Sequence, residues 1–189
     1  MLETLDTVRD DAEARLARAA QDRRSAMHTP VVATGNADVR VMVLRDFDPW
    51  GLRFHTDVRA PKVNMIEGAP QVGVLFYDKA EGVQIRVRGT ARIERDGPIA
   101  DAAWEESTNF ARRCYLGEGP GAVAEKPTSG LPAAFEGLEP TDEELLPARE
   151  NFAVLLVDLH ELDWFHLAHD GHRRALIDLA TGESRWITP

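Results

Sequence analysis

The strongest constraint on the fold of this chain is a set of short segments in which apolar and polar residues alternate. Apolar residues occupy every second position of residues 39–43 and of residues 83–87. A period of two residues is typical of a β-strand that buries one of its faces. Residues 46–51, which contain Asp, Pro and Gly, separate the strand before them from the one that follows. Turn-forming residues between alternating segments predict sequential antiparallel hairpins.

Applied to the whole chain, this pattern gives a mainly β protein with peripheral helices. Helices are expected at 2–26, at 61–67 and from 96 to about 113, where apolar residues recur at helical spacing. Together with the strands, these elements predict an antiparallel barrel or sandwich with attached helices. The expected strands are 30–34, 39–45, 52–56, 71–77, 83–93, 152–159, 164–168, 173–178 and 184–187.

The length of 189 residues fits one domain with appendages. We expect an N-terminal helical segment at 1–29 and a single domain at 30–189. Within that domain, residues 117–147 contain many Pro and Gly residues and lack a clear period. A loop of this length inside a compact domain is typically functional, so 117–147 is predicted to be a mobile loop.

Composition excludes several classes of protein. The net charge of −10 argues against nonspecific binding to nucleic acid or to anionic membranes. The single cysteine, Cys114, excludes an internal disulfide framework and is interpreted as a spectator thiol. The charged N-terminal segment does not resemble a secretory signal, and no apolar run reaches the roughly 20 residues of a membrane span. We therefore expect a cytoplasmic protein.

Basic residues are concentrated in one part of this acidic chain. Residues 40–95 contain ten bases and seven acids, whereas 117–150 contain two bases and eight acids. Arg40 begins a predicted strand, and Arg59 and Lys62 lie where the next predicted helix begins. A helix N-terminus and nearby cations suit a phosphate group. The alternative, arginines on the solvent face of strands, remains open and fits Arg86 and Arg88 equally well.

Several short motifs follow one another in a fixed order along the chain. They are Arg40–Arg45, Phe54–Asp57, Pro61–Val63, Val72–Tyr77 and Gln84–Gly89. In this order they resemble the pyridoxamine 5′-phosphate oxidase family of FMN-binding split barrels. At the C-terminus, Trp164, the His172–Arg174 triplet and Trp186 agree with the way this family ends. The resemblance covers about residues 30 to 189 and implies a split β-barrel, an FMN cofactor and a homodimer with FMN at the subunit interface.

The resemblance also implies a set of cofactor-binding positions. Arg40 and Lys62 would bind the FMN phosphate, and Gln84 would hydrogen-bond the polar edge of the flavin ring. Pro61 stands where the family has a phosphate-binding arginine, which Arg59 would replace. Residues from the partner subunit would complete the site. The implied positions are Arg40, Val41, Met42, Val43, His55, Thr56, Arg59, Pro61, Lys62, Gln84, Thr128, Ser129, Trp164 and Arg174.

The substrate positions of the family are altered in this chain. Arg45 replaces a lysine, Asn109 falls near a tyrosine position, and Asp170 replaces an arginine that clasps the substrate phosphate. The remaining substrate-binding candidates are Arg45, Arg113 and His172. We therefore expect an FMN-dependent oxidoreductase with a different, unknown substrate. The alternatives are a genuine pyridoxamine/pyridoxine 5′-phosphate oxidase and a non-enzymatic FMN- or haem-binding protein.

A run of three histidines, His166, His169 and His172, invites a metal assignment. Asp170–Gly171 is a strong hairpin signal. Successive strand residues point to opposite faces, so the three rings are not expected to converge. We predict no metal site. Without the resemblance, Trp164 would read simply as a core residue.

Overall fold

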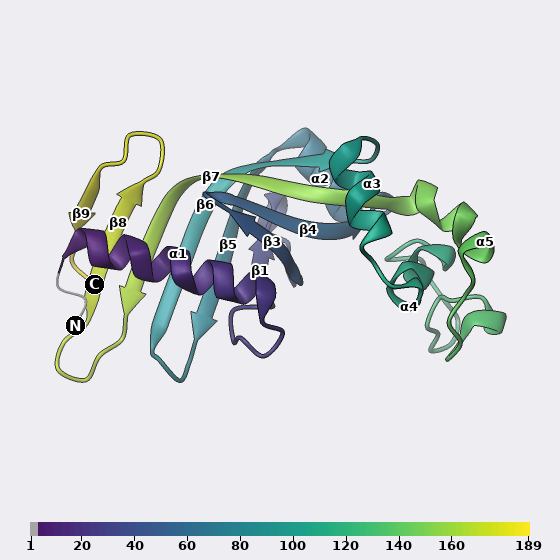
Figure 1. Ribbon diagram of the computed structural model, residues 1–189, viewed down its shortest axis with the longest axis horizontal. Helices are drawn as coiled ribbons and strands as arrows, with labels where there is room; N and C mark the ends of the chain where they lie inside the picture. The colour runs from purple at the N-terminus through teal and green to yellow at the C-terminus, as the bar shows by residue number, and fades with distance from the viewer. Residues whose placement is uncertain (1–3) are drawn as a thin grey trace. The chain divides into compact units, whose positions relative to one another are not determined.

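The computed structural model describes residues 4–189 and shows a mostly antiparallel sheet with a few helices (Figure 1), which confirms the predicted fold class. The α-helices are α1 (Leu5–Gln21), α2 (Pro61–Gly68), α3 (Pro98–Glu105), α4 (Asn109–Arg112) and α5 (Asp142–Leu145). The strands are β1 (Val31–Ala33), β2 (Val39–Val41), β3 (Leu44–Asp48), β4 (Gly51–Asp57), β5 (Gln71–Asp78), β6 (Val83–Glu94), β7 (Phe152–His166), β8 (Arg173–Asp178) and β9 (Ser184–Trp186).

The strands form one sheet in the order β2-β1-β5-β6-β7-β4-β3, and β8 extends it from β7 to β9. Most neighbours in sequence are antiparallel hairpin partners, as the spacing of turns predicts. In the β5–β6 pair, Leu75 lies opposite Arg86 and Gly73 lies opposite Arg88. In the β7–β8 pair, Trp164 lies opposite Ala175.

Four predicted elements differ from the structure. The strand expected at 39–45 is two strands, β2 and β3, because the chain leaves the β1–β2 ladder after Val41, and β3 continues to Asp48 through part of the expected turn. The first helix ends at Gln21 rather than near residue 26, because the cap residue Asp22 is already extended; predicted helical residues 2 and 3 lie outside the described residues. The helix expected to run to about 113 breaks after α3, and Thr108 caps a new helix, α4. Strands expected at 152–159 and 164–168 are one continuous strand, β7, because its central residues stay hydrogen-bonded on both sides.

The chain divides into two compact units. The first unit contains the residues up to Phe54, Ala69–Arg92 and Leu156–Pro189; the second contains His55–Gly68 and Ile93–Leu155. Strands β4, β6 and β7 contribute residues to both. The predicted loop at 117–147 belongs wholly to the second unit.

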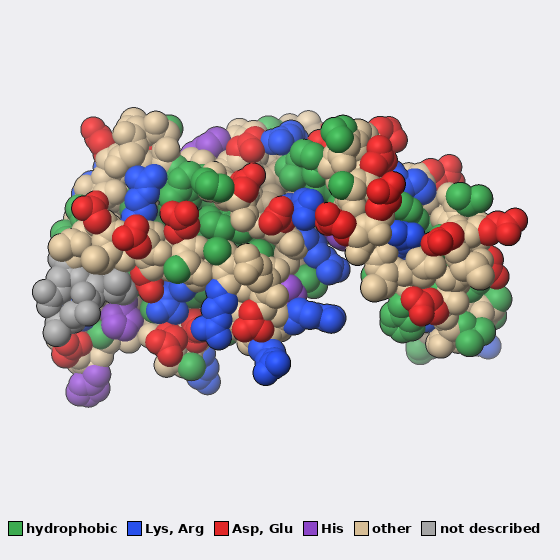
Figure 2. Space-filling view, viewed as in Figure 1, with side chains coloured by type: hydrophobic (Ala, Val, Ile, Leu, Met, Phe, Trp, Pro, Cys, Tyr) green, Lys and Arg blue, Asp and Glu red, His purple; other side chains and the backbone are tan. Residues whose placement is uncertain are grey.

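In the first unit, α1 packs against β3, β8 and β9 and covers one face of the strands (Figure 1). Its buried residues, Val8, Ala12, Leu16 and Ala19, recur at helical spacing. The indole N–H of Trp164 donates to the Asp11 carboxylate across 2.9 Å, so β7 and α1 are joined by a hydrogen bond. Acidic and basic side chains lie intermixed on the outer side of α1 (Figure 2).

In the second unit, aromatic rings form the centre of the packing. Phe152 is 1% exposed. Its ring centroid lies 5.0 Å from His55, 5.1 Å from Tyr115 and 5.4 Å from Trp104. Edge-to-face arrangements at these distances stabilise a cluster beyond simple burial. This cluster fixes the end of β4, where His55 lies, against the start of β7.

Candidate functional site

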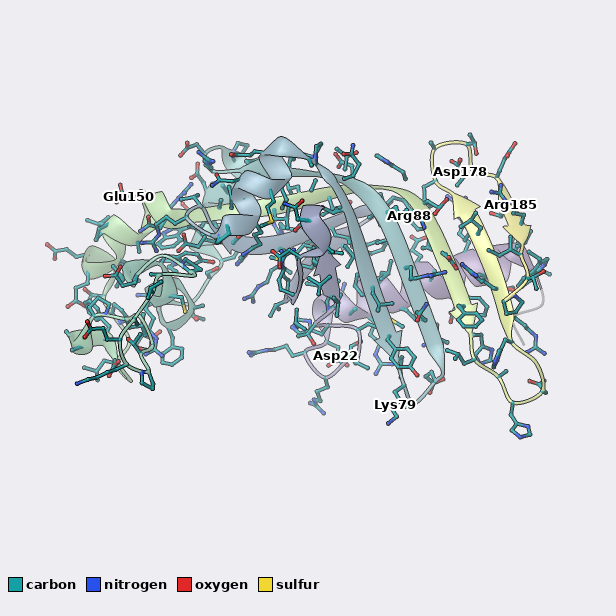
Figure 3. All side chains as sticks on the ribbon, turned by 180° about the vertical axis from the view of Figure 1, so that it is seen from behind. Asp22, Lys79, Arg88, Glu150, Asp178 and Arg185 are labelled. Carbon is teal, nitrogen blue, oxygen red and sulfur yellow. The ribbon has the colours of Figure 1, made fainter. Side chains whose placement is uncertain are left out.

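The face of the first unit that is turned away from α1 is not covered by any helix of that unit, and we call it the open face. Figure 3 shows Arg88 on this face. Alternation along each strand places the rest of its residues. The open face carries Val31, Ala33, Val39, Val41, Gly73, Leu75, Tyr77, Gln84, Arg86, Arg88, Glu161, Asp163, Phe165 and Arg174.

The open face has an apolar half and a charged half. In the apolar half, Val39 is 59% exposed and Val41 is 63% exposed. A groove of about 290 Å³ runs between the halves, with Val31, Ala33 and Leu75 on one side and Arg86 and Asp163 on the other. Gly73 widens it, because no side chain stands there. A flat apolar group with polar edges would fit such a surface.

Three charged groups meet in the charged half. Asp163 is 5% exposed. Its Oδ1 accepts from Arg174 Nε at 2.9 Å, its Oδ2 accepts from Arg174 Nη2 at 2.7 Å, and Oδ2 also accepts from Arg86 Nη2. Burial by itself would raise the pKa of Asp163, but its hydrogen bonds with Arg174 and the charge of Arg86 outweigh burial and lower it. Asp163 is therefore a buried carboxylate held ionised by two arginines.

Two of the predicted cofactor-binding residues lie on the open face, and a third points toward α1. Gln84 and Arg174 lie on the open face, on the strands that flank β7. Trp164 faces α1 and is 0% exposed, with its N–H bonded to Asp11. Its buried side chain offers no surface to a flavin in this subunit. The position of Trp164 agrees with its alternative interpretation as a core residue.

Arg40 lies within the β1–β2 hairpin. Its guanidinium donates to Thr34 Oγ1 at 3.0 Å and to the Val32 carbonyl at 3.2 Å, and it pairs with Asp38. The neighbouring residues Met42 and Val43 link β2 to β3, and the Met42 N–H donates to the Pro30 carbonyl. Arg40 thus has a fixed position at the strand end, with Asp38 as a competing anion.

In the second unit, the predicted phosphate residues lie where β4 passes into α2. Thr56 and Asp57 end β4, and Pro61 begins α2, with Lys62 next to it. The Arg59 guanidinium forms two hydrogen bonds with Asp57, at 3.0 Å and 2.7 Å, and donates to the Gly117 carbonyl at 3.0 Å. The bonds with Asp57 raise the pKa of Arg59. Arg59 therefore does not offer a free positive charge in place of the missing arginine.

Hydrogen bonds from Arg113 and from local side chains stabilise the segment 117–147. Arg113 donates through Nη1 to the Phe135 carbonyl at 3.1 Å and to the Leu138 carbonyl at 3.0 Å. Its guanidinium stacks 3.6 Å from the centroid of the Phe110 ring. Exposed Thr128 and Ser129 form local hydrogen bonds, including Ser129 to Glu136 at 2.7 Å. Arg113, which the resemblance places at the substrate, therefore stabilises the conformation of residues 135–138.

The remaining substrate candidates lie in the first unit. Arg45 is exposed on β3, next to a bulge between Leu44 and Asp46. His172 is exposed in the β7–β8 turn, with its ring 5.6 Å from Phe165, which faces Arg174 across the hairpin. Asp170 pairs with Arg173 at 3.3 Å, which lowers the pKa of Asp170. His172 is the substrate candidate whose side chain lies beside an open-face residue.

Sequence reasoning missed two acidic residues of the site. Asp57 and Asp163 are both buried and both bind arginines. A signal for Asp163 was present, since it interrupts the apolar Leu162–Trp164 stretch of a strand, and a charge in such a place requires a partner. The identity of that partner depends on strand register. No comparable signal marked Asp57, which follows an ordinary strand end.

Comparisons with known proteins agree with this geometry. Residues 11–95 match the pyridoxamine 5′-phosphate oxidase, FMN-binding domain. A pyridoxine/pyridoxamine 5′-phosphate oxidase of Caulobacter vibrioides is 34% identical over 83 residues, which are 44% of this chain and 34% of that protein. One of Rhodopseudomonas palustris is 31% identical over 105 residues, 56% of this chain and 46% of that protein. The aligned region thus spans between a third and a half of these relatives.

Among solved structures, a pyridoxamine 5′-phosphate oxidase-related, FMN-binding protein of Nostoc punctiforme is 26% identical, with a TM-score of 0.72 over 95% of this chain and 96% of that chain. PhzG of Burkholderia lata, 16% identical, has a TM-score of 0.67 over 95% of this chain and 91% of its own, which shows the shared fold. No helix within residues 4–189 has the length and apolar character needed to cross a membrane. Residues 11–95 therefore match an FMN-binding domain, and the chain shares its fold with a pyridoxamine 5′-phosphate oxidase-related, FMN-binding protein.

Proposed function

We propose that this protein is an FMN-dependent oxidoreductase whose substrate is not pyridoxamine 5′-phosphate. Gln84 and Arg174 remain on the open face, whereas the substrate-side residues are replaced or engaged. The observation that carries this proposal is Arg113. Its Nη1 is bonded to two backbone carbonyls and its guanidinium is stacked on Phe110, so the segment 135–138, and not a substrate phosphate, sets its position.

The chemistry of the first unit fits a flavin nucleotide. It offers an apolar groove bordered by arginines, with the amide of Gln84 on the same face, which suits a flat ring with a polar edge. We assign Gln84 to the ring and Arg40, in the β1–β2 hairpin of the same unit, to the phosphate. In the second unit, Lys62 lies next to the start of α2, where an ammonium and a helix N-terminus suit an anion.

When bound, FMN supplies hydride transfer at ring nitrogen N5, and the protein supplies orientation and electrostatics. Gln84 would orient the ring by a neutral hydrogen bond. Arg174 would place a positive charge beside the ring, because its guanidinium remains on the open face. The apolar residues of the groove would exclude water from the ring. No side chain on the open face is assigned as a proton donor or acceptor.

We further propose that the protein acts as a homodimer through the open face. Val39 and Val41 leave an exposed apolar strip there, which a partner with the same strip would cover. Arg174 would then face the flavin of the partner subunit. Sedimentation at several concentrations tests this. We expect a dimer, and Val41→Glu should give a monomer; a monomeric wild-type protein would contradict the proposal.

The first test is the absorbance spectrum of the purified protein, followed by titration of the apo form with FMN. We expect flavin bands and one FMN per subunit. Arg40→Ala should weaken FMN about tenfold to a hundredfold, because a hydrogen bond to a charged group is lost. Because Arg40 also supports its hairpin, Arg40→Lys provides a second variant. Arg45→Ala removes an exposed guanidinium five residues away and serves as the matched control, with FMN affinity unchanged.

The second test offers pyridoxamine 5′-phosphate to the FMN-loaded protein under oxygen. We expect no pyridoxal 5′-phosphate to form. Oxidation at a steady rate would restore the alternative of a genuine pyridoxamine 5′-phosphate oxidase. Two other outcomes would instead favour a binding protein without turnover. One is a haem Soret band without flavin bands, and the other is bound FMN that is reduced only by dithionite.

A further inference from the structure

The Arg86–Asp163–Arg174 cluster is built differently from the other ion pairs of the open face. The Asp163 side chain is 8% exposed and that of Arg174 is 27% exposed. In the neighbouring pair, the Glu161 side chain is 30% exposed and that of Arg88 is 74% exposed. A buried carboxylate requires its partners, whereas an exposed pair contributes little and samples other positions. The Asp163 cluster is therefore fixed, and the Glu161 pair is not.

The backbone beneath this cluster is also fixed. Asp163 and Trp164 are consecutive residues of β7, so their side chains point to opposite faces. On one face the Trp164 indole is buried and bonded to Asp11 of α1. On the other face Asp163 is bonded to two arginines. Rotation or sliding of the strand at this point would break contacts on both sides.

The geometry of Arg174 leaves part of its guanidinium available. A guanidinium has five N–H donors in one plane, and Asp163 takes one from Nε and one from Nη2. This two-point contact sets the plane of the group, as in other bidentate arginine–carboxylate pairs. The N–H groups of Nη1 then point away from Asp163. With Arg86 as the second cation, the three groups carry one net positive charge.

We propose that Asp163 is a positioning residue, which orients Arg174 so that its outer N–H groups meet the polar edge of the flavin. This inference rests on the proposed function, since it takes FMN as the ligand of Arg174. Arg86 donates a further hydrogen bond to Asp163 Oδ2, and its positive charge allows the carboxylate to stay ionised. In this proposal Asp163 acts on FMN through Arg174.

A double-mutant cycle on the FMN dissociation constant tests this proposal in the full-length protein. We expect Arg174→Gln to weaken FMN about tenfold and Asp163→Asn to weaken it about threefold to tenfold, on the scale of one charge-assisted hydrogen bond. The double variant should bind FMN no more weakly than Arg174→Gln alone. Non-additivity of this kind shows that one residue acts through the other.

Asp158→Asn is the matched control. Asp158 lies on the same strand and pairs with Arg92 of β6 at 2.5 Å, but both side chains are more than half exposed. The same chemical change there should leave FMN affinity unchanged. If Asp163→Asn does not fold, Arg174→Lys replaces it, because lysine keeps the charge and loses the planar fork. We expect Arg174→Lys to bind FMN as weakly as Arg174→Gln.

Each result has a defined meaning. Equal weakening by Asp163→Asn in the wild-type and Arg174→Gln backgrounds would overturn the proposal, because Asp163 would then act independently of Arg174. Wild-type affinity in Arg174→Gln or in Arg174→Lys would also overturn it. Failure of the wild-type protein to bind FMN would instead refute the proposed function, and the titration of wild-type protein separates the two cases.

Discussion

The arginines of the two units have different partners, although they look alike in the sequence. In the first unit, Arg86, Arg88 and Arg174 pair with carboxylates across neighbouring strands and remain on the open face. In the second unit, Arg59, Arg112 and Arg113 bind backbone carbonyls, those of Gly117, Trp104 and Phe135 among others. The arginines of the first unit place positive charge on an exposed face. Those of the second unit hydrogen-bond carbonyls of a segment with little regular structure.

This difference follows from what surrounds each arginine. Paired strands satisfy most of their own carbonyls, so Arg86, Arg88 and Arg174 bond to carboxylates of neighbouring strands. The segment around 117–147 has little regular structure, and its carbonyls need other donors, which planar guanidinium groups supply several at a time. Whether an arginine can bind a ligand therefore depends on the local backbone. Four substitutions can break or sharpen this contrast.

The largest effect is expected at the centre of the second unit. Phe152→Ala removes a ring that is 1% exposed and contacts three other rings. We expect the free energy of unfolding to fall by about 3–5 kcal/mol. Urea unfolding measures this, with Phe152→Leu as the control that retains most of the volume. A loss below about 1 kcal/mol would show that the cluster does not organise this unit.

A matched pair of glycines tests the first unit. A β-carbon at Gly89 would lie 2.9 Å from Val157 Cγ1 and against the Asp158 carbonyl, whereas one at Gly73 has only the Val87 carbonyl, 3.9 Å away. We expect Gly89→Ala to cost up to about 3 kcal/mol and Gly73→Ala to be tolerated. Gly73→Ala should still weaken FMN, since Gly73 lines the groove. Thermal melting and FMN titration measure the two effects, and equal melting temperatures would contradict the packing of β6 on β7.

Arg113→Gln tests the role of arginine in the second unit. The change removes a charged donor shared by the Phe135 and Leu138 carbonyls, so we expect a loss of about 2 kcal/mol. The segment 117–147 should also become more sensitive to limited proteolysis. Arg88→Gln, which removes an exposed arginine from the open face, is the control and should change neither. Unchanged proteolysis in Arg113→Gln would leave the segment held by other contacts.

The smallest effect concerns pH. Two arginines hold the pKa of Asp163 below its ordinary value, so its ionisation stabilises the fold above that value, and this contribution is lost as pH falls through the folded pKa. Asp163→Asn should therefore lower stability at pH 7 by about 1 kcal/mol, since both arginines keep some exposure. The difference from wild type should shrink from about pH 4 downward. A difference that is constant between pH 7 and pH 3 would exclude this ion cluster as its origin.

Local pattern alone determined much of the fold. The two-residue period located β4, β5 and β6 within about one residue, because burial of one face imposes that period wherever a strand forms. It did not show that residues 39–45 divide into two strands. Short motifs in order indicated the split-barrel family and FMN, and residues 11–95 match an FMN-binding domain of that family.

Tertiary structure alone decided the state of each candidate side chain. Arg86 and Asp163 are 77 residues apart in sequence, and only the pairing of β6 with β7 brings them together. Trp164 faces α1 while its neighbour faces the groove, because the register of β7 sets which residue points to each side. Arg113 is bonded to carbonyls 22 and 25 residues away, which the sequence did not indicate. Sequence determined which residues can bind an anion; their long-range partners decided which of them remain able to do so.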